Sequence, residues 1–175
     1  MMTARALIFA TKAHGEQKRK YTGEPYVNHC IAVAGIVKQI TMDADIICAA
    51  LLHDTVEDTA VTIDNIAQIF GQRIAKLVSE VTDISRPLDG NRQQRKEIDR
   101  KHLAQASPDG MTIKLADLID NTSTIVKYDP HFAKIYMAEK RELLKVLTNG
   151  NPILFREANE LVENYFLQSK QMEEK

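Results

Sequence analysis

The fold is decided by the stretch Asp45-Ile46-Ile47-Cys48-Ala49-Ala50-Leu51-Leu52-His53-Asp54-Thr55-Val56-Glu57-Asp58-Thr59. Its first half, Ile46–Leu52, is apolar on nearly every side of a helix, which is typical of a helix at the centre of a bundle. Its second half is polar and carries one histidine and three carboxylates. We therefore predict one helix over residues 42–58 that is buried along most of its length and ends in a polar cluster.

The polar cluster indicates a metal site. His53 and Glu57 are four residues apart, as are Asp54 and Asp58, so helical geometry gathers all four on one side. Three carboxylates and an imidazole at the end of a buried helix would repel and desolvate one another without a cation. The alternative is a helix end that frays into solvent, where these charges cost little.

Outward from this stretch, the remaining sequence predicts helices almost throughout. Apolar residues recur at helical spacing, and no run alternates as a strand would. Thr62 is suited to begin a helix and Gly71 to end it. We expect helices over residues 3–13, 28–40, 62–70, 72–81, 93–106, 111–126, 130–147 and 152–168, with a basic loop over residues 18–26. The prediction is an all-α fold with one domain over residues 1–169 and a frayed tail over residues 170–175.

Composition excludes several classes of partner. The 175 residues include 23 basic and 24 acidic side chains, a net charge of −1 that gives no overall attraction to nucleic acid or anionic membranes. The longest strongly apolar run is far shorter than the roughly 20 residues of a membrane helix. Two cysteines form neither a metal-type pair nor a disulfide framework. We expect a cytoplasmic protein without nucleic-acid or membrane partners; the oligomeric state stays open.

Two further residues are candidate metal ligands. His29 begins the helix over residues 28–40, and Asp117 lies in a segment that is otherwise mostly apolar. Two histidines and two aspartates form a mixed nitrogen and oxygen set that suits Mn²⁺, Fe²⁺ or Zn²⁺, and spacing does not choose among them. The alternatives are a surface histidine and an exposed stripe that Asp117 shares with Lys114, Asp120 and Asn121. The other histidines, His14, His102 and His131, lie beside polar residues, and we expect them at the surface.

The order of these residues resembles a known family. His29, then His53-Asp54, then Asp117 matches the metal pattern of HD domains. The longer segments Arg19-Lys20, Gly23–His29, Ala50–Thr59 and Lys114–Asp117 resemble the hydrolase domain of the RelA/SpoT family. They are most similar to its single-domain members, the small alarmone hydrolases of the metazoan SpoT homologue type. The resemblance implies a single HD-domain helical bundle.

The resemblance also implies an activity: Mn²⁺-dependent hydrolysis that removes pyrophosphate from the 3′ position of (p)ppGpp, an alarmone of the stringent response, and leaves GDP or GTP. Other divalent transition metals fit the same ligands. By position, His29, His53, Asp54 and Asp117 would hold the metal. Glu57 and Asp58 match the family's paired acidic residues, which place and deprotonate the attacking water.

Substrate contacts carry over from the family by position too. Arg19 and Lys20 match its basic pair near the base and phosphates, and Asn121 matches an asparagine beside the ribose or phosphate. Tyr136 matches a tyrosine that contacts the nucleotide. The alternatives are a solvated charge run for the basic pair and a helix-packing aromatic for Tyr136. Asp120 departs from the family's usual sequence, and we expect it to alter base or phosphate preference.

Rival functions use the same residues. An HD-type hydrolase of (p)ppApp, NADPH or another phosphorylated nucleotide would need the same metal centre. A slow nucleotide sensor would keep the centre without a need for Glu57 and Asp58. A purely structural helical adaptor would leave the charged end of a buried helix unexplained.

Overall fold

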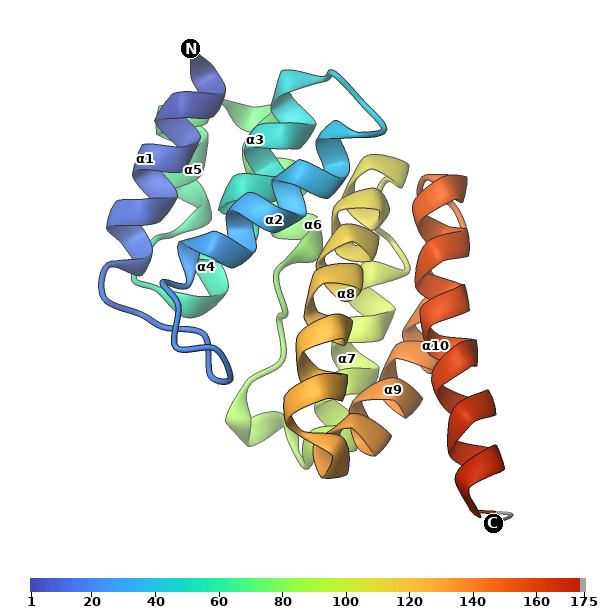
Figure 1. Cartoon of the computed structure of the whole chain (residues 1–175). Helices are drawn as coiled ribbons and strands as arrows, with labels where there is room; N and C mark the ends of the chain where they lie inside the picture. The colour runs from blue at the N-terminus through green and yellow to red at the C-terminus, as the bar shows by residue number, and fades with distance from the viewer. Residues whose placement is uncertain (174–175) are drawn as a thin grey trace.

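The computed structural model describes the backbone of residues 1–173 and is built from helices (Figure 1). They are α1 (Met2–His14), α2 (Val27–Lys38), α3 (Ala44–Leu52), α4 (Thr55–Asp58), α5 (Ile63–Phe70), α6 (Gln72–Val81), the 3₁₀ turn η1 (Pro87–Asp89), α7 (Arg92–Leu103), α8 (Pro108–Tyr128), α9 (Pro130–Leu144) and α10 (Pro152–Glu173). Within the described residues no strand occurs, and Lys18 and Pro25 form an isolated bridge. The all-α prediction is confirmed.

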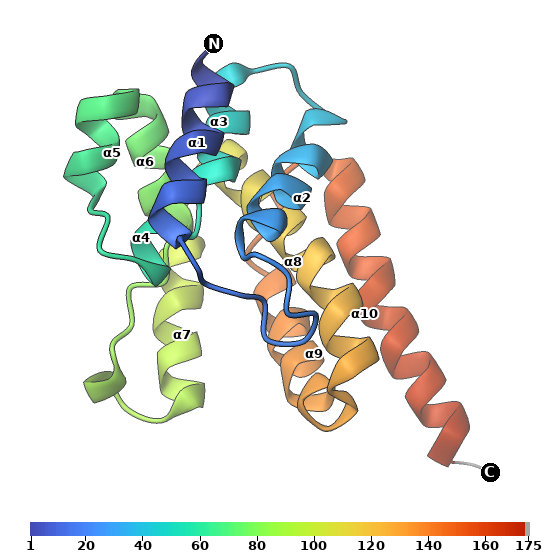
Figure 2. The ribbon, with the colours of Figure 1, turned by 60° about the vertical axis from the view of Figure 1, so that its left-hand side comes forward.

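Helix α3 lies at the centre of one half of the bundle. It packs against α1, α2, α6 and α8, and every residue from Ile46 to Leu52 is buried. The other half is formed by α7, α8, α9 and α10, with α8 long enough to run through both halves. Figure 2 shows α7 and α9 at the end of the molecule away from the N-terminus. Helix α8 therefore connects the two halves.

The prediction of one helix over residues 42–58 is wrong. Helix α3 ends at Leu52, His53 and Asp54 form a turn, and the short α4 follows. Side chains compete here for the carbonyl groups of the helix. Thr55 Oγ1 donates to the Leu52 carbonyl at 2.7 Å, and His53 Nδ1 donates to the Ala50 carbonyl at 2.8 Å. Such local bonds offer the backbone an alternative to the helical ladder.

Helix ends follow the expected capping chemistry in several places. Thr62 and Asn65 form a reciprocal capping box at the start of α5, and Gly71 ends that helix with φ of 94°, as predicted. Ser107 caps α8, so this helix begins earlier than expected, at Pro108. Helix α10 continues to Glu173 rather than ending at residue 168. Residues 174–175 of the expected tail lie outside the described residues.

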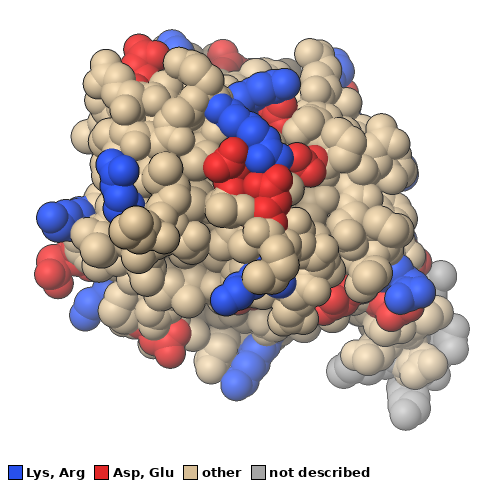
Figure 3. Space-filling model, turned by 90° about the horizontal axis from the view of Figure 1, so that it is seen from above, with Lys and Arg blue, Asp and Glu red and all other residues tan. Residues whose placement is uncertain are grey.

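Surface charges are mixed rather than segregated. Arg73 forms ion pairs with Asp43, Asp45 and Asp109, which lie at or near the starts of α3 and α8. Viewed from above, basic and acidic groups touch one another on a mostly uncharged face (Figure 3). No helix among the described residues combines the length and apolar character that crossing a membrane requires.

Candidate metal centre

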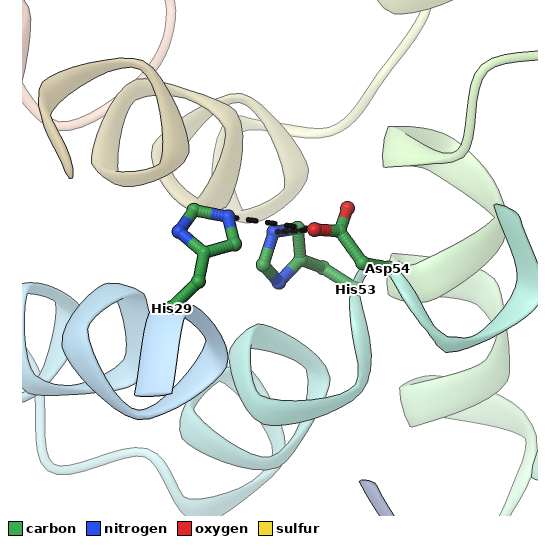
Figure 4. A group of neighbouring side chains, drawn as sticks. All are labelled: His29, His53 and Asp54. Atoms are coloured by element: carbon green, nitrogen blue, oxygen red, sulfur yellow. Dashed lines mark ion pairs between the residues drawn. The ribbon is translucent and has the colours of Figure 1, made fainter. Parts of the chain in front are cut away.

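Three elements bring the predicted ligands together. His29 comes from α2, His53 and Asp54 from the turn after α3, and Asp117 from α8. The Nε2 atom of His29 lies 3.4 Å from Asp54 Oδ2 and 3.2 Å from Asp117 Oδ1. The Nε2 atom of His53 lies 3.2 Å from Asp54 Oδ2 and 3.9 Å from Asp117 Oδ1. Figure 4 shows both imidazoles directed at the Asp54 carboxylate.

Both imidazoles present an unused nitrogen to this centre. His53 Nδ1 must carry the ring proton, because its partner is the Ala50 carbonyl, which only accepts. His29 Nδ1 lies 2.7 Å from Asp120 Oδ2, which likewise selects the proton on Nδ1. The Nε2 atoms of both histidines are buried and lack a hydrogen-bond partner among the described residues. Two such nitrogens beside two carboxylates fit a divalent cation.

Each carboxylate of the centre is fixed by a second group. Tyr26 donates its hydroxyl to Asp54 Oδ2 at 2.7 Å. Asn121 donates to Asp117 Oδ1 at 2.6 Å, and Lys114 Nζ lies 3.0 Å from Asp117 Oδ2. These partners orient the ligands before any cation binds, and groups in that role are important to metal affinity.

The electrostatics of the centre favour a bound positive charge. Burial lowers the pKa of His29, but the nearby carboxylates of Asp117, Asp120 and Asp54 raise it to about 11. Burial also acts to raise the pKa of Asp117, yet Lys114 and the two imidazoles hold that pKa well below its usual range. The acidic cluster therefore retains ionised carboxylates and attracts either protons or a metal cation.

Glu57 and Asp58 lie on α4 at the exposed rim of the centre. Desolvation raises the pKa of Glu57 to about 7, helped by the carboxylates of Asp83 and Asp54 and opposed by Lys114. The Asp83 backbone N–H donates to Glu57 Oε2 at 3.2 Å, while Asp58 Oδ2 accepts from Gln17 at 3.0 Å. A carboxyl with a pKa near neutrality is suited to accept a proton from water.

Comparison with known proteins identifies the family. Residues 6–149 match the model of the HD domain. The chain belongs to the HD-domain family. Its relatives include the human guanosine-3′,5′-bis(diphosphate) 3′-pyrophosphohydrolase MESH1, 34% identical over 171 residues that cover 93% of this chain and 92% of the human protein. The resemblance drawn from the sequence is thereby confirmed.

Other relatives of this HD domain are larger, and one solved structure is close to it throughout. The enzyme of the same activity name from Aquifex aeolicus is 40% identical over 146 residues, which cover 83% of this chain. The chain spans about a fifth of the length of the first such relatives. A structure described as a metazoan ortholog of SpoT that hydrolyzes ppGpp matches with a TM-score of 0.83, 30% identity and coverage of 94% of this chain and 95% of that one.

The predicted substrate residues of the HD domain have different surroundings. Arg19 donates to Asp120 at 2.8 Å and to Asn121 at 3.2 Å, and its side chain is only 11% exposed. Lys20 is 74% exposed and lies beside Asp129. Tyr136 is buried in the core, and its hydroxyl lacks a partner among the described residues. Arg19 and Asn121 therefore join the centre, Lys20 stays at the surface and Tyr136 lies in the core.

Several functional contacts of this HD domain escaped the sequence analysis. Asp120 bridges His29 and Arg19, a role its position one residue before Asn121 did not suggest. Tyr26 and Lys114 were placed in segments that resemble the family but were given no role, and the alternative of an exposed stripe that includes Lys114 is wrong, since Lys114 is 8% exposed. The expectation of surface histidines is wrong for His14, which is 5% exposed. The signal for Lys114 and Asp120 was their spacing of three residues on either side of Asp117.

Proposed function

We propose that this HD domain removes the 3′-pyrophosphate of ppGpp or pppGpp by hydrolysis and releases pyrophosphate with GDP or GTP. The observation that carries the proposal is the pair of unpartnered Nε2 atoms, of His29 and His53, beside the Asp54 and Asp117 carboxylates. The human relative supports the substrate, since it bears that activity in its name and matches over 92% of its length.

We infer that His29, His53, Asp54 and Asp117 hold one divalent cation, with Mn²⁺ as the metal in use. Two imidazole nitrogens and two carboxylates suit a borderline transition metal better than an all-oxygen site would. When bound, such a cation lowers the pKa of water and neutralises charge on phosphate. Tyr26, Lys114, Asp120 and Asn121 keep the ligands in place through the bonds described above.

Glu57 is the group we assign to accept the proton, and Asp58 helps to place the water. The water oxygen attacks the phosphorus attached to the ribose 3′ oxygen, and the bond between that phosphorus and the 3′ oxygen breaks. Glu57 takes one proton from the water, the ribose 3′ oxygen takes a proton from solvent as it leaves, and pyrophosphate departs with the water oxygen and its remaining proton. A pKa near 7 lets Glu57 start ionised at neutral pH and release its proton after each turnover.

The proposed nucleotide contacts remain Lys20, Arg19, Asn121 and Tyr136. They differ in how accessible their side chains are to a substrate. Lys20 reaches solvent and can meet a phosphate directly. Arg19 must exchange part of its bonding to Asp120 and Asn121 for a substrate group, and Tyr136 must be reached through the core. We propose the cytoplasm as the compartment, since both free cysteines, Cys30 and Cys48, are reduced thiols in the interior.

Product analysis tests this function. The purified protein with Mn²⁺ is incubated separately with ppGpp, ppApp, GDP and NADPH, beside Asp54→Ala as the control. Pyrophosphate and GDP from ppGpp, absent with the variant, would support the proposal. Turnover of ppApp or NADPH alone would keep the metal centre and replace the substrate. Metal binding without turnover of any of the four would contradict hydrolysis and favour a nucleotide sensor.

A further inference from the structure

A cavity of about 780 Å³ lies between α7 and α9, with a residue of α8 in its wall. One part of its lining is apolar and includes Leu103, Ile135 and Leu143. The rest is densely charged and includes both acids and bases. A cavity of this size admits a small ligand, and the charged part decides which chemistry it accepts.

Most cations of this wall are already paired. Arg92 bonds Glu139 at 2.6 Å, Lys96 lies 2.6 Å from Asp83, and Lys114 lies 3.0 Å from Asp117. Lys134 and Lys140 form no ion pair with any described residue, and of these two Lys134 is exposed whereas Lys140 is partly buried. The Lys140 ammonium lies over the ring of Tyr136, whose centroid is 4.8 Å from Nζ.

The cavity adjoins the metal centre. Lys114 lines the cavity and also contacts the ligand Asp117, and Asp83 lines it while its backbone N–H holds Glu57. A ligand beside Lys140 therefore shares its cavity with Lys114 and Asp83, which contact the groups that would bind the metal and accept the proton. Lys140 itself has no part in the function proposed above.

The surroundings of Lys140 favour a bound anion. Burial lowers its pKa to about 8, and the positive charges of Lys114 and Lys96 act in the same direction, while Asp117 and Asp83 oppose them. A partly buried lysine with two cationic neighbours and no ion pair of its own gains stability as a cation when negative charge enters the cavity.

We propose that Lys140 binds a phosphate-bearing anion in the cavity between α7 and α9, as a recognition residue of this HD domain. The anion is either a phosphate group of the nucleotide substrate or the pyrophosphate that the reaction releases. A lysine ammonium binds phosphate as a compact point charge with three donors. Such a contact suits an anion that must dissociate again after each turnover. The source of the anion rests on the proposed function, whereas anion binding does not.

The test compares Lys140→Met with Lys134→Met. Methionine keeps most of the lysine's length and apolar stem but removes the charge. Lys134 is the matched control because it lies on the same helix and lines the same cavity, but is exposed. Both variants and the parent are titrated with inorganic pyrophosphate by calorimetry at one fixed concentration of free Mn²⁺, and kcat and KM are measured with ppGpp.

We expect Lys140→Met to weaken pyrophosphate binding or raise the KM for ppGpp by about tenfold or more, since a hydrogen bond to a charged group is lost. Weakened pyrophosphate binding assigns the released product, and a raised KM alone assigns the nucleotide. Values within twofold of the parent in both measurements, or equal losses in Lys134→Met, would overturn the proposal.

A second variant separates charge from folding. Lys140→Arg keeps the charge and should retain most of the pyrophosphate affinity, whereas a loss equal to that of Lys140→Met would overturn a role for charge. Thermal unfolding by circular dichroism checks that each variant is folded. Because the titration needs no turnover, a parent that binds pyrophosphate but leaves ppGpp intact would contradict the proposed function and keep the anion site.

Discussion

The metal centre and the cavity between α7 and α9 meet at one turn of α8, yet their polar groups are satisfied in opposite ways. In the metal centre, each carboxylate and each Nδ1 atom has a protein partner, and only the Nε2 atoms of His29 and His53 are unused. In the cavity, most cations have a carboxylate and Lys140 has none.

The difference shows two complementary sites that meet within one turn of α8. Unused imidazole nitrogens beside ionised carboxylates favour a cation, whereas an unpaired ammonium favours an anion. Lys114 and Asp117, three residues apart, connect the two sites through their ion pair at 3.0 Å. A substrate that carries diphosphate groups needs positive charge at more than one point, and a metal and a lysine supply it at two.

The largest expected effect is loss of the cation site itself. Asp54→Ala removes a carboxylate on which both imidazoles converge, so metal binding and activity should disappear together. Loss of several kcal/mol of charge stabilisation corresponds to a fall in kcat/KM of about 10³-fold or more. Metal content by mass spectrometry and the rate with ppGpp are measured on the same preparation.

Asp45→Asn is the matched control for that variant. Asp45 lies near the start of α3, the helix that precedes Asp54, and its side chain is 38% exposed in an ion pair with Arg73. Surface pairs of this kind contribute little, about 0–1 kcal/mol. Asp54→Ala protein that kept its full metal content would contradict the assigned ligand set.

Glu57→Gln sharpens the comparison by leaving the metal centre intact. The amide is isosteric but accepts no proton, so kcat should fall by about 10²–10⁴-fold while metal content is unchanged. Asp58→Asn should also lower turnover, because Asp58 helps to place the water. Full turnover in both variants would remove the acidic pair of α4 from the reaction.

The sequence was sufficient to predict those structural features that depend on residues close to one another along the chain. The central position of Ile46–Leu52 follows from an apolar run, and the ends of α5 follow from Thr62 and Gly71. The break after Leu52 was not predicted, because it depends on side-chain bonds from His53 and Thr55 that compete with helical ones. Helix propensity does not predict whether a side-chain hydrogen bond or the helical backbone hydrogen bond forms at such a position.

Contacts between helices could not be derived from spacing. Asp120 lies 91 positions from His29, and Tyr26 lies 28 positions from Asp54, so only the packing of α2 against α8 and α3 brings them together. The meeting of His29 with Asp117 was expected from a family pattern rather than from physical reasoning. Lys140 gave no signal, because its isolation depends on which neighbours already have partners.

Asp120→Asn tests whether the order in the metal centre depends on this long-range contact. The amide is a weaker acceptor for His29 Nδ1 and loses the ion pair with Arg19. We expect metal affinity to fall by about 10–100-fold, as for other groups that orient metal ligands. Competition with a metal-binding dye measures the affinity.

Asp109→Asn provides the control on the same helix, since Asp109 is 44% exposed and lies 3.4 Å from Arg73. It should leave metal affinity unchanged. If Asp120→Asn also leaves the affinity within twofold of the parent, Asp120 does not position His29.

The smallest expected effect is a pH-dependent difference in stability at Lys140. Its pKa is lowered from 10.5 to about 8 in the folded protein, so between these values the unfolded chain binds more protons. Stability therefore rises with pH across that window, and the parent should gain about 1–2 kcal/mol relative to Lys140→Met. The facing groups are Lys114 and Asp117 on α8, Lys96 on α7 and Asp83 in the preceding loop. Urea unfolding at pH 7.5 and 10.5 measures the difference, and parallel curves would show that burial of the charge costs nothing.

Hydrolysis of ppGpp in ¹⁸O-labelled water tests the central claim most directly. The protein is stripped of metal, divided, and assayed with and without added Mn²⁺, and the products are read by ³¹P magnetic resonance and mass spectrometry. We predict GDP without label and pyrophosphate with one ¹⁸O atom, formed only in the sample with Mn²⁺. Release of inorganic phosphate, label in the GDP ribose, or equal rates without metal would contradict metal-dependent attack at the 3′-attached phosphorus.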